Sequence, residues 1–145
     1  MNVQTILSAK GTEVATIAPS ATLAEATEML RARGFGALVV SADGMALDGI
    51  LSERDIVRAL AAHGVATLER KIATCMSSEV FTCGPSDSID ALMSMMTERR
   101  IRHVPVIAGN GLAGMISIGD VVKYRLGELE RENDQLHDYI QGNVG

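Results

Sequence analysis

The sequence predicts an α+β fold in which one β-α-β-β-α unit occurs twice and is followed by a long C-terminal helix. Three observations support this prediction. Val14–Ser20 aligns with Val80–Ser86, and after a shift of one residue Gly49–Val57 aligns with Gly114–Val122. Helical and strand periodicities follow one another in the same order in both halves. The last polar segment carries apolar residues at alternating four- and three-residue steps.

Composition favours a compact domain built from two small units. The chain has 145 residues, 47% of them hydrophobic, but no Trp and only two each of Phe and Tyr. The core must therefore be aliphatic, and 145 residues allow one domain or two small ones that share a core. The net charge of −5 argues against a dedicated nucleic-acid-binding protein, which usually carries a basic surplus.

The first half justifies each element of the unit. Thr22 and Glu25 are typical of a capping box at a helix start, and Gly34 is well placed to end that helix. Asp43-Gly44 is a hairpin signal between two strands. The expected elements are a strand Val14–Ile17 ended by Pro19, a helix Leu23–Gly34, strands Ala37–Val40 and Leu47–Leu51, and a helix around Ile56–Ala61 ending near Gly64.

The second half repeats this order. Pro105 cannot donate a hydrogen bond to a neighbouring strand, so its strand is expected either to lie at a sheet edge or to begin at this residue. Gly109–Gly114 matches the GxGxxG pattern, but a strand follows it where a dinucleotide fold needs a helix, so we interpret it as a hairpin turn. The expected elements are a helix Ser88–Arg100, a strand Val104–Ile107, a turn Asn110-Gly111 and a strand Leu112–Ile116. Each copy is too small to bury its own faces, so the two should pack together.

The last helix is expected to run from about Val121 to Gln141. Its apolar seam has one polar member and consists of Val122, Leu126, Leu129, Asn133, Leu136 and Ile140. Such a seam lies either on the helix's own domain or against a second copy of the chain. Because the helix extends past the repeat, we predict a dimer contact.

Cysteine usage and the chain start bear on location. Cys75 and Cys83 form no CxxC pair and have no neighbouring His, so we expect buried free thiols and no metal site. The first residues lack the basic and apolar segments of a signal peptide, and no stretch reaches the ~18 apolar residues of a membrane span. These patterns predict a cytoplasmic protein with no membrane segment.

No catalytic site is predicted. His63, His103 and His137 lack metal-binding spacing, and no GxSxG elbow is present. The methionines Met93, Met95 and Met96 are best explained as core residues. We therefore expect a protein that is not an enzyme.

Two repeated Ser–Asp pairs stand where a strand gives way to a helix: Ser52 with Asp55, and Ser117 with Asp120. Unpaired backbone N–H groups at a helix start suit an anion, and the carboxylate suits the hydroxyls of a sugar. Capping of the helix is the simpler interpretation of one such pair, but the duplication favours a ligand site. Arg102-His103 precedes the adjacent strand and would hold phosphates at the same sheet edge.

The repeat, the order of its elements and the paired Gly-Ile-Leu-Ser-x-x-Asp and Gly-Met-Ile-Ser-x-x-Asp segments resemble CBS domains, the regulatory modules named after cystathionine beta-synthase. The resemblance covers about residues 7 to 125. It implies a stand-alone CBS pair, also called a Bateman module, packed around a pseudo-twofold axis. The implied parts are repeats at 7–66 and 73–126 and a helical extension at 127–145. It also implies signal transduction or energy sensing through adenosine-containing ligands such as AMP, ATP, NAD or S-adenosylmethionine.

The resemblance implies two ligand clefts between the repeats. In the main cleft Asp120 would hold the ribose, Ser117 the ribose or a phosphate, and Arg102, His103 and Lys10 the phosphates. The main cleft would consist of Lys10, Val14, Ala15, Phe35, Arg102, His103, Ser117, Ile118, Gly119 and Asp120. The second cleft would consist of Ser52, Arg54, Asp55, Met76, Val80, Phe81 and Ile101. Because Gly36-Ala37 stands where the second copy has Arg102-His103, we expect phosphorylated ligands to prefer the main cleft.

Two other functions are compatible with the residues. A structural or protein-interaction module would leave its clefts unoccupied and work through the C-terminal helix. Nucleic-acid binding through Arg99–His103 is disfavoured by the negative charge and the absence of an aromatic stacking platform. A regulatory module would also need an effector protein to read its state.

Overall fold

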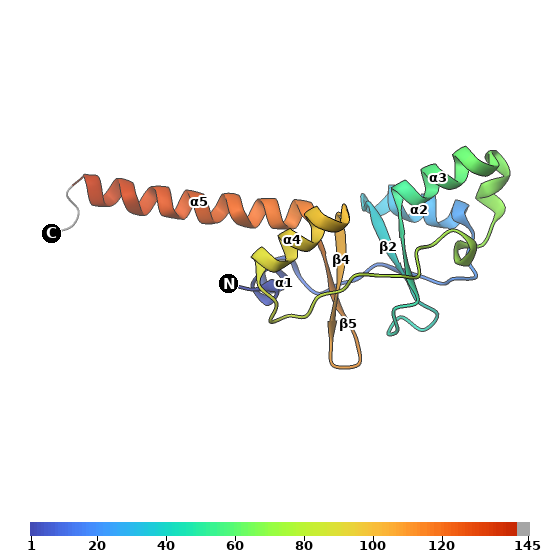
Figure 1. Cartoon of the computed structure of the whole chain (residues 1–145), viewed down its shortest axis with the longest axis horizontal. Coiled ribbons are helices and arrows are strands. Elements are labelled where there is room, and N and C mark those ends of the chain that lie inside the picture. The colour runs from blue at the N-terminus through green and yellow to red at the C-terminus, as the bar shows by residue number, and fades with distance from the viewer. Residues whose placement is uncertain (142–145) are drawn as a thin grey trace.

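The computed structural model describes residues 1–141. Two units of similar architecture lie side by side, each with a small sheet and two helices, and α5 (Ile118–Ile140) extends away from them (Figure 1). The helices gather on one side of the molecule, and the strand hairpins point to the other. The predicted α+β fold with a repeated unit and a long C-terminal helix is confirmed.

The first unit contains a three-stranded sheet and helices α2 (Leu23–Arg33) and α3 (Glu53–His63). The strands are β1 (Thr16–Ile17), β2 (Ala37–Val40) and β3 (Gly49–Ser52); β1 is parallel to β2, and β2 is antiparallel to β3. Helix α2 starts and ends at the predicted residues, with Gly34 in the left-handed conformation. The Thr22 side chain accepts the Glu25 N–H, which is one of the two bonds of the predicted capping box. The buried core is aliphatic and consists of Ile17, Leu23, Ala26, Leu30, Leu38, Val40, Leu51, Ile56, Ala59 and Ile72.

Two strands of the first unit are shorter than expected. β1 has two residues, and β3 begins at Gly49 because the preceding loop is organised by Asp43. The Asp43 carboxylate accepts the N–H groups of Met45 and Ala46, both at 2.8 Å. The predicted hairpin between these strands is confirmed, and Asp43-Gly44 belongs to its connecting loop, which the Asp43 side chain stabilises.

The second unit contains α4 (Ile89–Arg99), the antiparallel strands β4 (His103–Ala108) and β5 (Gly111–Ser117), and the start of α5. The GxGxxG segment is a hairpin turn, as predicted, but its turn residues are Gly109-Asn110, one position earlier than expected. Gly109 takes the positive φ, at 60°. The second core consists of Val3, Ile6, Leu7, Cys83, Ile89, Leu92, Met96, Val104, Val106, Ile116 and Val121.

The first strand of the second unit is reduced to one bridge, between Cys83 and Val106. The Cys83 N–H donates to Pro105 O at 3.0 Å, and the Ile107 N–H donates to Cys83 O at 2.8 Å. In the first unit the Val39 N–H continues the pairing by donating to Ala15 O. Its counterpart is Pro105, which has no N–H, so the pairing ends there and the first strand of the repeat is not formed in the second unit.

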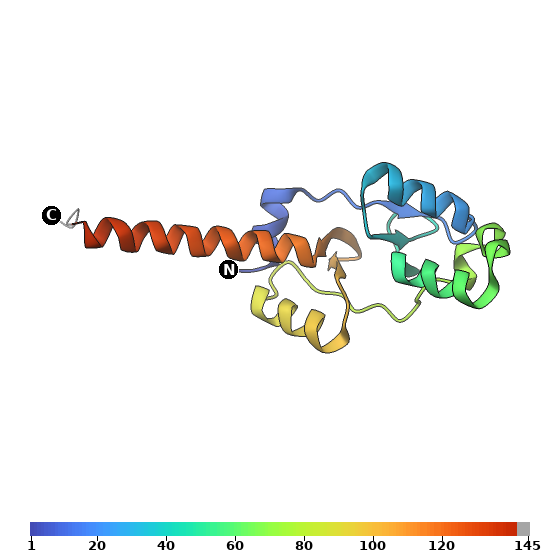
Figure 2. The same ribbon diagram turned by 90° about the horizontal axis from the view of Figure 1, so that it is seen from above.

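The N-terminal helix α1 (Val3–Lys10) was not predicted from the sequence. It precedes the first unit in the chain, but Val3, Ile6 and Leu7 are buried in the core of the second unit. Figure 2 shows α1 beside α5, with a linker running on to the first unit. The short 3₁₀ turn Ile72–Thr74 mirrors this exchange, because Ile72 precedes the second unit and is buried in the first. The core of each unit thus contains residues from the chain segment that precedes the other unit.

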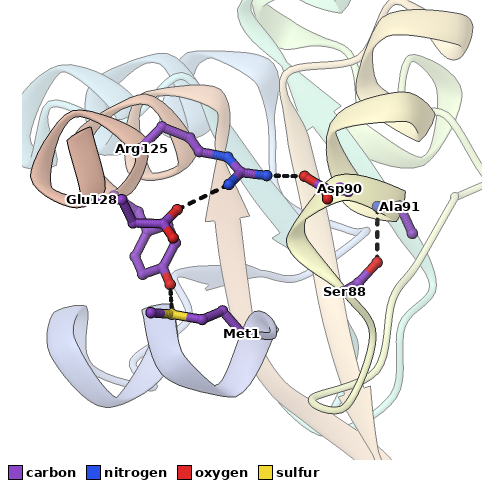
Figure 3. Close-up of polar contacts among 7 residues, drawn as sticks. Met1, Ser88, Asp90, Ala91, Arg125 and Glu128 are labelled. Atoms are coloured by element: carbon purple, nitrogen blue, oxygen red, sulfur yellow. Dashed lines mark hydrogen bonds and ion pairs between the residues drawn. The ribbon is translucent and has the colours of Figure 1, made fainter. Parts of the chain in front are cut away.

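The helix α5 begins at Ile118, three residues before its expected start. Arg125 lies between Asp90 of α4 and Glu128 of α5, and holds α5 against α4 (Figure 3). The Tyr124 hydroxyl contacts the Met1 sulfur, which adds a contact to the N-terminal segment. Beyond Glu128, every residue up to position 141 is exposed.

Both cysteines are free, as predicted, but only Cys83 is fully buried. Burial, with a smaller contribution from Asp87, raises the pKa of the Cys83 thiol to about 11. Within residues 1–141 no helix combines the length and apolar character needed to cross a bilayer.

Candidate functional site

The two Ser–Asp pairs cap equivalent helices. At the start of α5 the Asp120 N–H donates to Ser117 Oγ at 3.1 Å, and the Ser117 N–H donates to Asp120 Oδ2 at 2.9 Å. At the start of α3 the Asp55 N–H donates to Ser52 Oγ at 3.2 Å, and the Ser52 N–H donates to Asp55 Oδ2 at 3.0 Å. Capping, the simpler interpretation, is therefore present at both positions. It occupies one carboxylate oxygen of each pair.

Lys10 extends the Asp120 site. Its ammonium, at the end of α1, donates to Asp120 Oδ2 and to Met115 O, both at 2.7 Å. Burial favours the protonated carboxyl of Asp120, but the hydrogen bonds from Lys10 and Ser117 outweigh it and lower the pKa. Asp120 is therefore held as a carboxylate by a cation that the sequence places 110 positions away.

His103 lies where the two units meet. A Cβ added to Gly36 would be 3.0 Å from His103 Cε1 and 3.1 Å from Nε2, so the absent side chain leaves room for the imidazole. Burial lowers the pKa of His103, and the charges of Glu53 and Asp120 oppose that effect. Glu53 begins α3, so the imidazole lies between the helix starts of both units.

The backbone around this junction repeats in both units. The Glu53 N–H donates to Gly36 O at 3.0 Å, and the Ile118 N–H donates to Arg102 O at 2.8 Å. Each bond ties a helix start to the residue before the adjacent strand. The Arg102 side chain, Ile118 and Gly119 are exposed at this end of the molecule.

The linker between Lys10 and Ala15 connects the Asp120 end to the sheet of the first unit. Lys10 pairs with Asp120, and Ala15 O accepts the Val39 N–H of β2 at 3.1 Å. The five residue steps from Lys10 to Ala15 span at most ~18 Å when extended. Val14 and Ala15, both half-buried, are therefore joined to the Asp120 site through this short linker and Lys10.

The residues expected in the second cleft are spread over several environments. Asp55 Oδ1 accepts the Ser77 hydroxyl at 3.4 Å, and a Cβ on Gly49 would be 2.7 Å from Met76 Sδ. Arg54 Nη1 donates across the junction to Arg100 O at 3.4 Å. The Arg99 guanidinium lies over the Phe81 ring, 4.7 Å from the ring centroid. Val80 is half-buried, and Ile101 packs on the core of the second unit.

Two hollows stand out in the described part of the chain, and both lie on the first unit. One has a volume of about 430 Å³ and is lined by Thr27, Leu30, Arg31, Gly34, Phe35, Glu53, Ile56 and Val57. The other has a volume of about 240 Å³ and is lined by Asp55, Arg58, Ala59, His63, Arg70, Thr74 and Cys75. Phe35 thus lines an outer hollow that does not include Val14 or Ala15. Asp55 borders the smaller hollow, and Asp120 borders neither.

Sequence reasoning missed the roles of three residues at the junction. Gly36 leaves the space that His103 fills, Glu53 is the acidic neighbour of His103, and Ser77 donates a hydrogen bond to Asp55. The alignment contained a signal for the first, because Gly36 stands opposite Arg102 in the repeat. Glu53 stands opposite Ile118, an asymmetry visible in the same alignment. Ser77 lies in the linker and carries no local signal.

Comparison with known proteins gives consistent matches. The family model described as CBS domain matches residues 10–62 and 70–127. The chain is 38% identical over 125 residues to the CBS domain-containing protein CBSX3, mitochondrial, of Arabidopsis thaliana, covering 83% of this chain and 61% of that protein. The chain therefore spans less than two thirds of that relative's length.

Solved structures share the same architecture. A CBS-domain protein from Agrobacterium tumefaciens is 44% identical, with a TM-score of 0.82 over 86% of this chain and 92% of that chain. The CBS domain pair of protein MJ0100, solved in complex with 5′-methylthioadenosine and S-adenosyl-L-methionine, is 23% identical. Its TM-score is 0.77 over 88% of this chain and 98% of that chain. At that identity the second likeness concerns the fold alone.

Proposed function

Because this chain belongs to the CBS-domain family and carries the domain twice, we propose that it is a non-catalytic regulatory module that binds an adenine nucleotide of the AMP, ATP or NAD class between its repeats. The observation that carries the proposal is the Asp120 helix start, where a carboxylate lies near the cations Lys10 and Arg102 and the imidazole of His103. The ligands of the MJ0100 domain pair, which both contain adenosine, support the choice of ligand class.

The Asp120 end has the groups that such a ligand needs. Within residues 1–141, Asp120 Oδ1 has no hydrogen-bond partner, so it is available to a ribose hydroxyl while Oδ2 caps the helix. Arg102 and His103 would face the phosphates, since guanidinium and imidazole donate to anions. The adenine would lie along Val14 and Ala15, which a short linker joins to Lys10.

A thermal-shift screen tests the ligand class. AMP, ADP, ATP, NAD, NADH and S-adenosylmethionine would be added to the full chain at increasing concentration. A ligand that binds only the folded state raises the melting temperature with concentration. We expect at least one adenine nucleotide to do so, with guanosine monophosphate as the matched control. Absence of a shift with all six compounds would contradict the proposal.

The exposed seam of α5 supports a homodimer. Leu126, Leu129 and Ile140 are 56%, 59% and 72% exposed, although they occupy core positions of the heptad pattern. A free helix of this length is marginal in water, so the projecting turns of α5 gain stability from a partner. We propose that this partner is a second copy of the chain, and that an effector protein reads the ligand state of the dimer.

The same seam favours one alternative, an interaction module that works through α5 with its clefts unoccupied. Truncation after Gly127 separates the two functions. Loss of the dimer with intact nucleotide affinity supports the ligand-sensing function, whereas the alternative predicts no nucleotide binding in either form. The expected cytoplasmic location stays a prediction, and the Arabidopsis relative is named as mitochondrial.

A further inference from the structure

The smaller hollow of the first unit, with a volume of about 240 Å³, is lined by three basic side chains. Arg58 and His63 lie on α3, and Arg70 lies in the segment between the two units. Within residues 1–141 none of the three forms an ion pair. Asp55 is the one carboxylate among the described residues that line the hollow, so two guanidinium groups outnumber it in a chain whose net charge is −5. A positive site of this kind on an acidic protein attracts anions.

The backbone that carries these side chains is held in place. The hydroxyl of Thr67, a fully buried residue, donates to Ala59 O of α3 at 3.0 Å. The Arg70 N–H donates to Thr67 O at 3.0 Å, and Arg70 O accepts the Leu23 N–H at the start of α2, also at 3.0 Å. These bonds fix the Arg70 backbone beside α3. A site that is already formed loses less conformational entropy when a ligand binds.

The second unit does not repeat this arrangement of side chains. In the repeat alignment Arg58, Ala59, His63 and Arg70 stand opposite Lys123, Tyr124, Glu128 and Gln4. Tyr124 is much larger than its counterpart and packs against the core of the second unit, and Glu128 adds a negative charge. A large side chain and a carboxylate therefore stand where the first unit has space and positive charge. The hollow is a feature of the first unit alone and does not follow from the repeated fold.

The basic side chains are suited to a phosphate group. A guanidinium donates hydrogen bonds in a planar fork, and a carboxylate ligand has the oxygens for one such fork. A phosphate carries more oxygens, which point in different directions, so it can pair with Arg58 and Arg70 at the same time. The volume of about 240 Å³ lies below the ~300–1,000 Å³ of sites that enclose a whole small molecule. It therefore favours a group of the size of a phosphate or diphosphate.

We propose that this hollow binds a phosphate or diphosphate group through Arg58 and Arg70, with His63 as a further donor. Among its lining residues only Asp55 belongs to the expected second cleft. The site therefore goes beyond the proposed function and does not require a nucleotide at Asp120. The group comes either from a free anion or from the end of a ligand that also contacts Asp55, and both sources present the same chemistry to the two arginines.

Titration of the full chain with inorganic pyrophosphate, followed in two-dimensional amide NMR spectra, tests the site. We expect pyrophosphate to move the signals of Arg58 to His63 and of residues 70–75. Arg70→Gln and Arg58→Gln should each weaken this binding by at least ~10-fold, because each removes hydrogen bonds between charged groups. Arg58 is exposed on α3, so its variant keeps the test valid if Arg70→Gln proves unstable. Signals that move only at the Asp120 end, or nowhere, would overturn the proposal.

Lys123→Gln is the matched control. Lys123 stands opposite Arg58 in the repeat, is exposed on α5 and carries the same charge. Its substitution should leave the affinity of the hollow for pyrophosphate unchanged. Equal losses in Lys123→Gln and Arg58→Gln would show that net charge alone attracts the anion, and would overturn the site.

AMP and ATP distinguish the two sources of the phosphate in an Asp120→Ala background. If the group belongs to a nucleotide at Asp55, ATP should bind at least ~10-fold more tightly than AMP, and Arg58→Gln should remove that difference. If the group is a free anion, pyrophosphate should bind and ATP should have no advantage over AMP. Either result supports the site. Pyrophosphate binding at the hollow without nucleotide binding at Asp120 would contradict the proposed function and leave this inference standing.

Discussion

His103 shows how a single residue can join two repeats. Gly36 leaves the space that its imidazole fills, and Glu53 and Asp120 bring one acidic group from each unit. The positive charges of Lys10 and Arg102 oppose protonation of the ring. The protonation of the half-buried ring is therefore favoured by two carboxylates and opposed by burial.

The lowered pKa of His103 predicts a dependence of stability on pH. Its ordinary value is 6.5, and burial keeps the folded-state value below that. As pH falls below 6.5, the unfolded chain binds the proton first, so the free energy of unfolding decreases. We expect His103→Gln to lose less stability than the wild type between about pH 7 and about pH 5.

Urea denaturation across that pH range provides the measurement. His63→Gln, which changes an exposed histidine at the end of α3, is the matched control and should follow the wild type. If the His103→Gln and wild-type curves stay parallel over the whole range, burial of His103 is not what sets the pH dependence.

At the scale of elements, the linker before the second unit is fixed to the edge strand β3. The Ile50 N–H donates to Ser77 O, and the Ser77 N–H donates to Ile50 O, both at 2.9 Å. A Cβ on Gly49 would lie 2.9 Å from Ser77 O, a backbone atom that these bonds hold in place. The close approach requires glycine at this position.

Gly49→Ala is therefore expected to destabilise the protein by ~1–3 kcal/mol, the usual cost of an overpacked contact. Gly127→Ala is the control, because Gly127 lies within α5 and an alanine there should stabilise the helix by ~0.5–1 kcal/mol. Chemical denaturation of both variants gives the comparison. Equal stability of Gly49→Ala and the wild type would mean that the linker moves away from β3 easily.

The helix α5 also predicts the orientation of the proposed dimer. In a parallel, in-register pair Asn133 meets Asn133 of the second copy, and Glu132 lies beside the copy's His137. In the fully overlapping antiparallel pair Asn133 meets a leucine, and Glu130 and Glu132 each oppose their own copies. A buried amide without a partner is unfavourable, and like charges repel, so the parallel pair is favoured.

Disulfide cross-linking distinguishes these orientations. In a Cys75→Ser background, Leu136→Cys should form a disulfide between two copies of the chain when the helices are parallel and in register. In the antiparallel pair position 136 faces position 126, and the two introduced thiols lie too far apart to bond. Arg131→Cys, on the outer side of the helix, serves as the control. A dimer in solution whose Leu136→Cys variant fails to cross-link would exclude the parallel arrangement.

At the scale of the whole molecule, local sequence patterns predicted the repeated units, but they could not predict the contacts between the units. Thr22, Gly34 and Ser117 act within a few residues of their own positions, so their roles followed from spacing. Lys10 pairs with Asp120 over 110 positions, and no periodicity links them. Pro105 is intermediate: its missing N–H was visible, but its effect on the strand at Cys83 required the parallel pairing.

In the candidate site, too, the local features could be predicted from the sequence and the packing of side chains could not. Repetition identified the Ser–Asp pairs, and the structure places both at helix starts as expected. Phe35 was assigned to the main cleft through the family resemblance, and it lines an outer hollow between α2 and α3. The direction of a side chain at the end of a helix depends on packing, which the alignment does not contain.

The central claim is that the Asp120 end of the junction binds an adenine nucleotide. Calorimetric titration of the wild type, Asp120→Ala and Asp55→Ala with AMP, ATP and NAD tests it most directly. We predict that Asp120→Ala weakens binding of the preferred nucleotide by ~1–3 kcal/mol through lost ribose hydrogen bonds, and that Asp55→Ala has a smaller effect. Affinities for all three nucleotides that are unchanged by Asp120→Ala would contradict the claim.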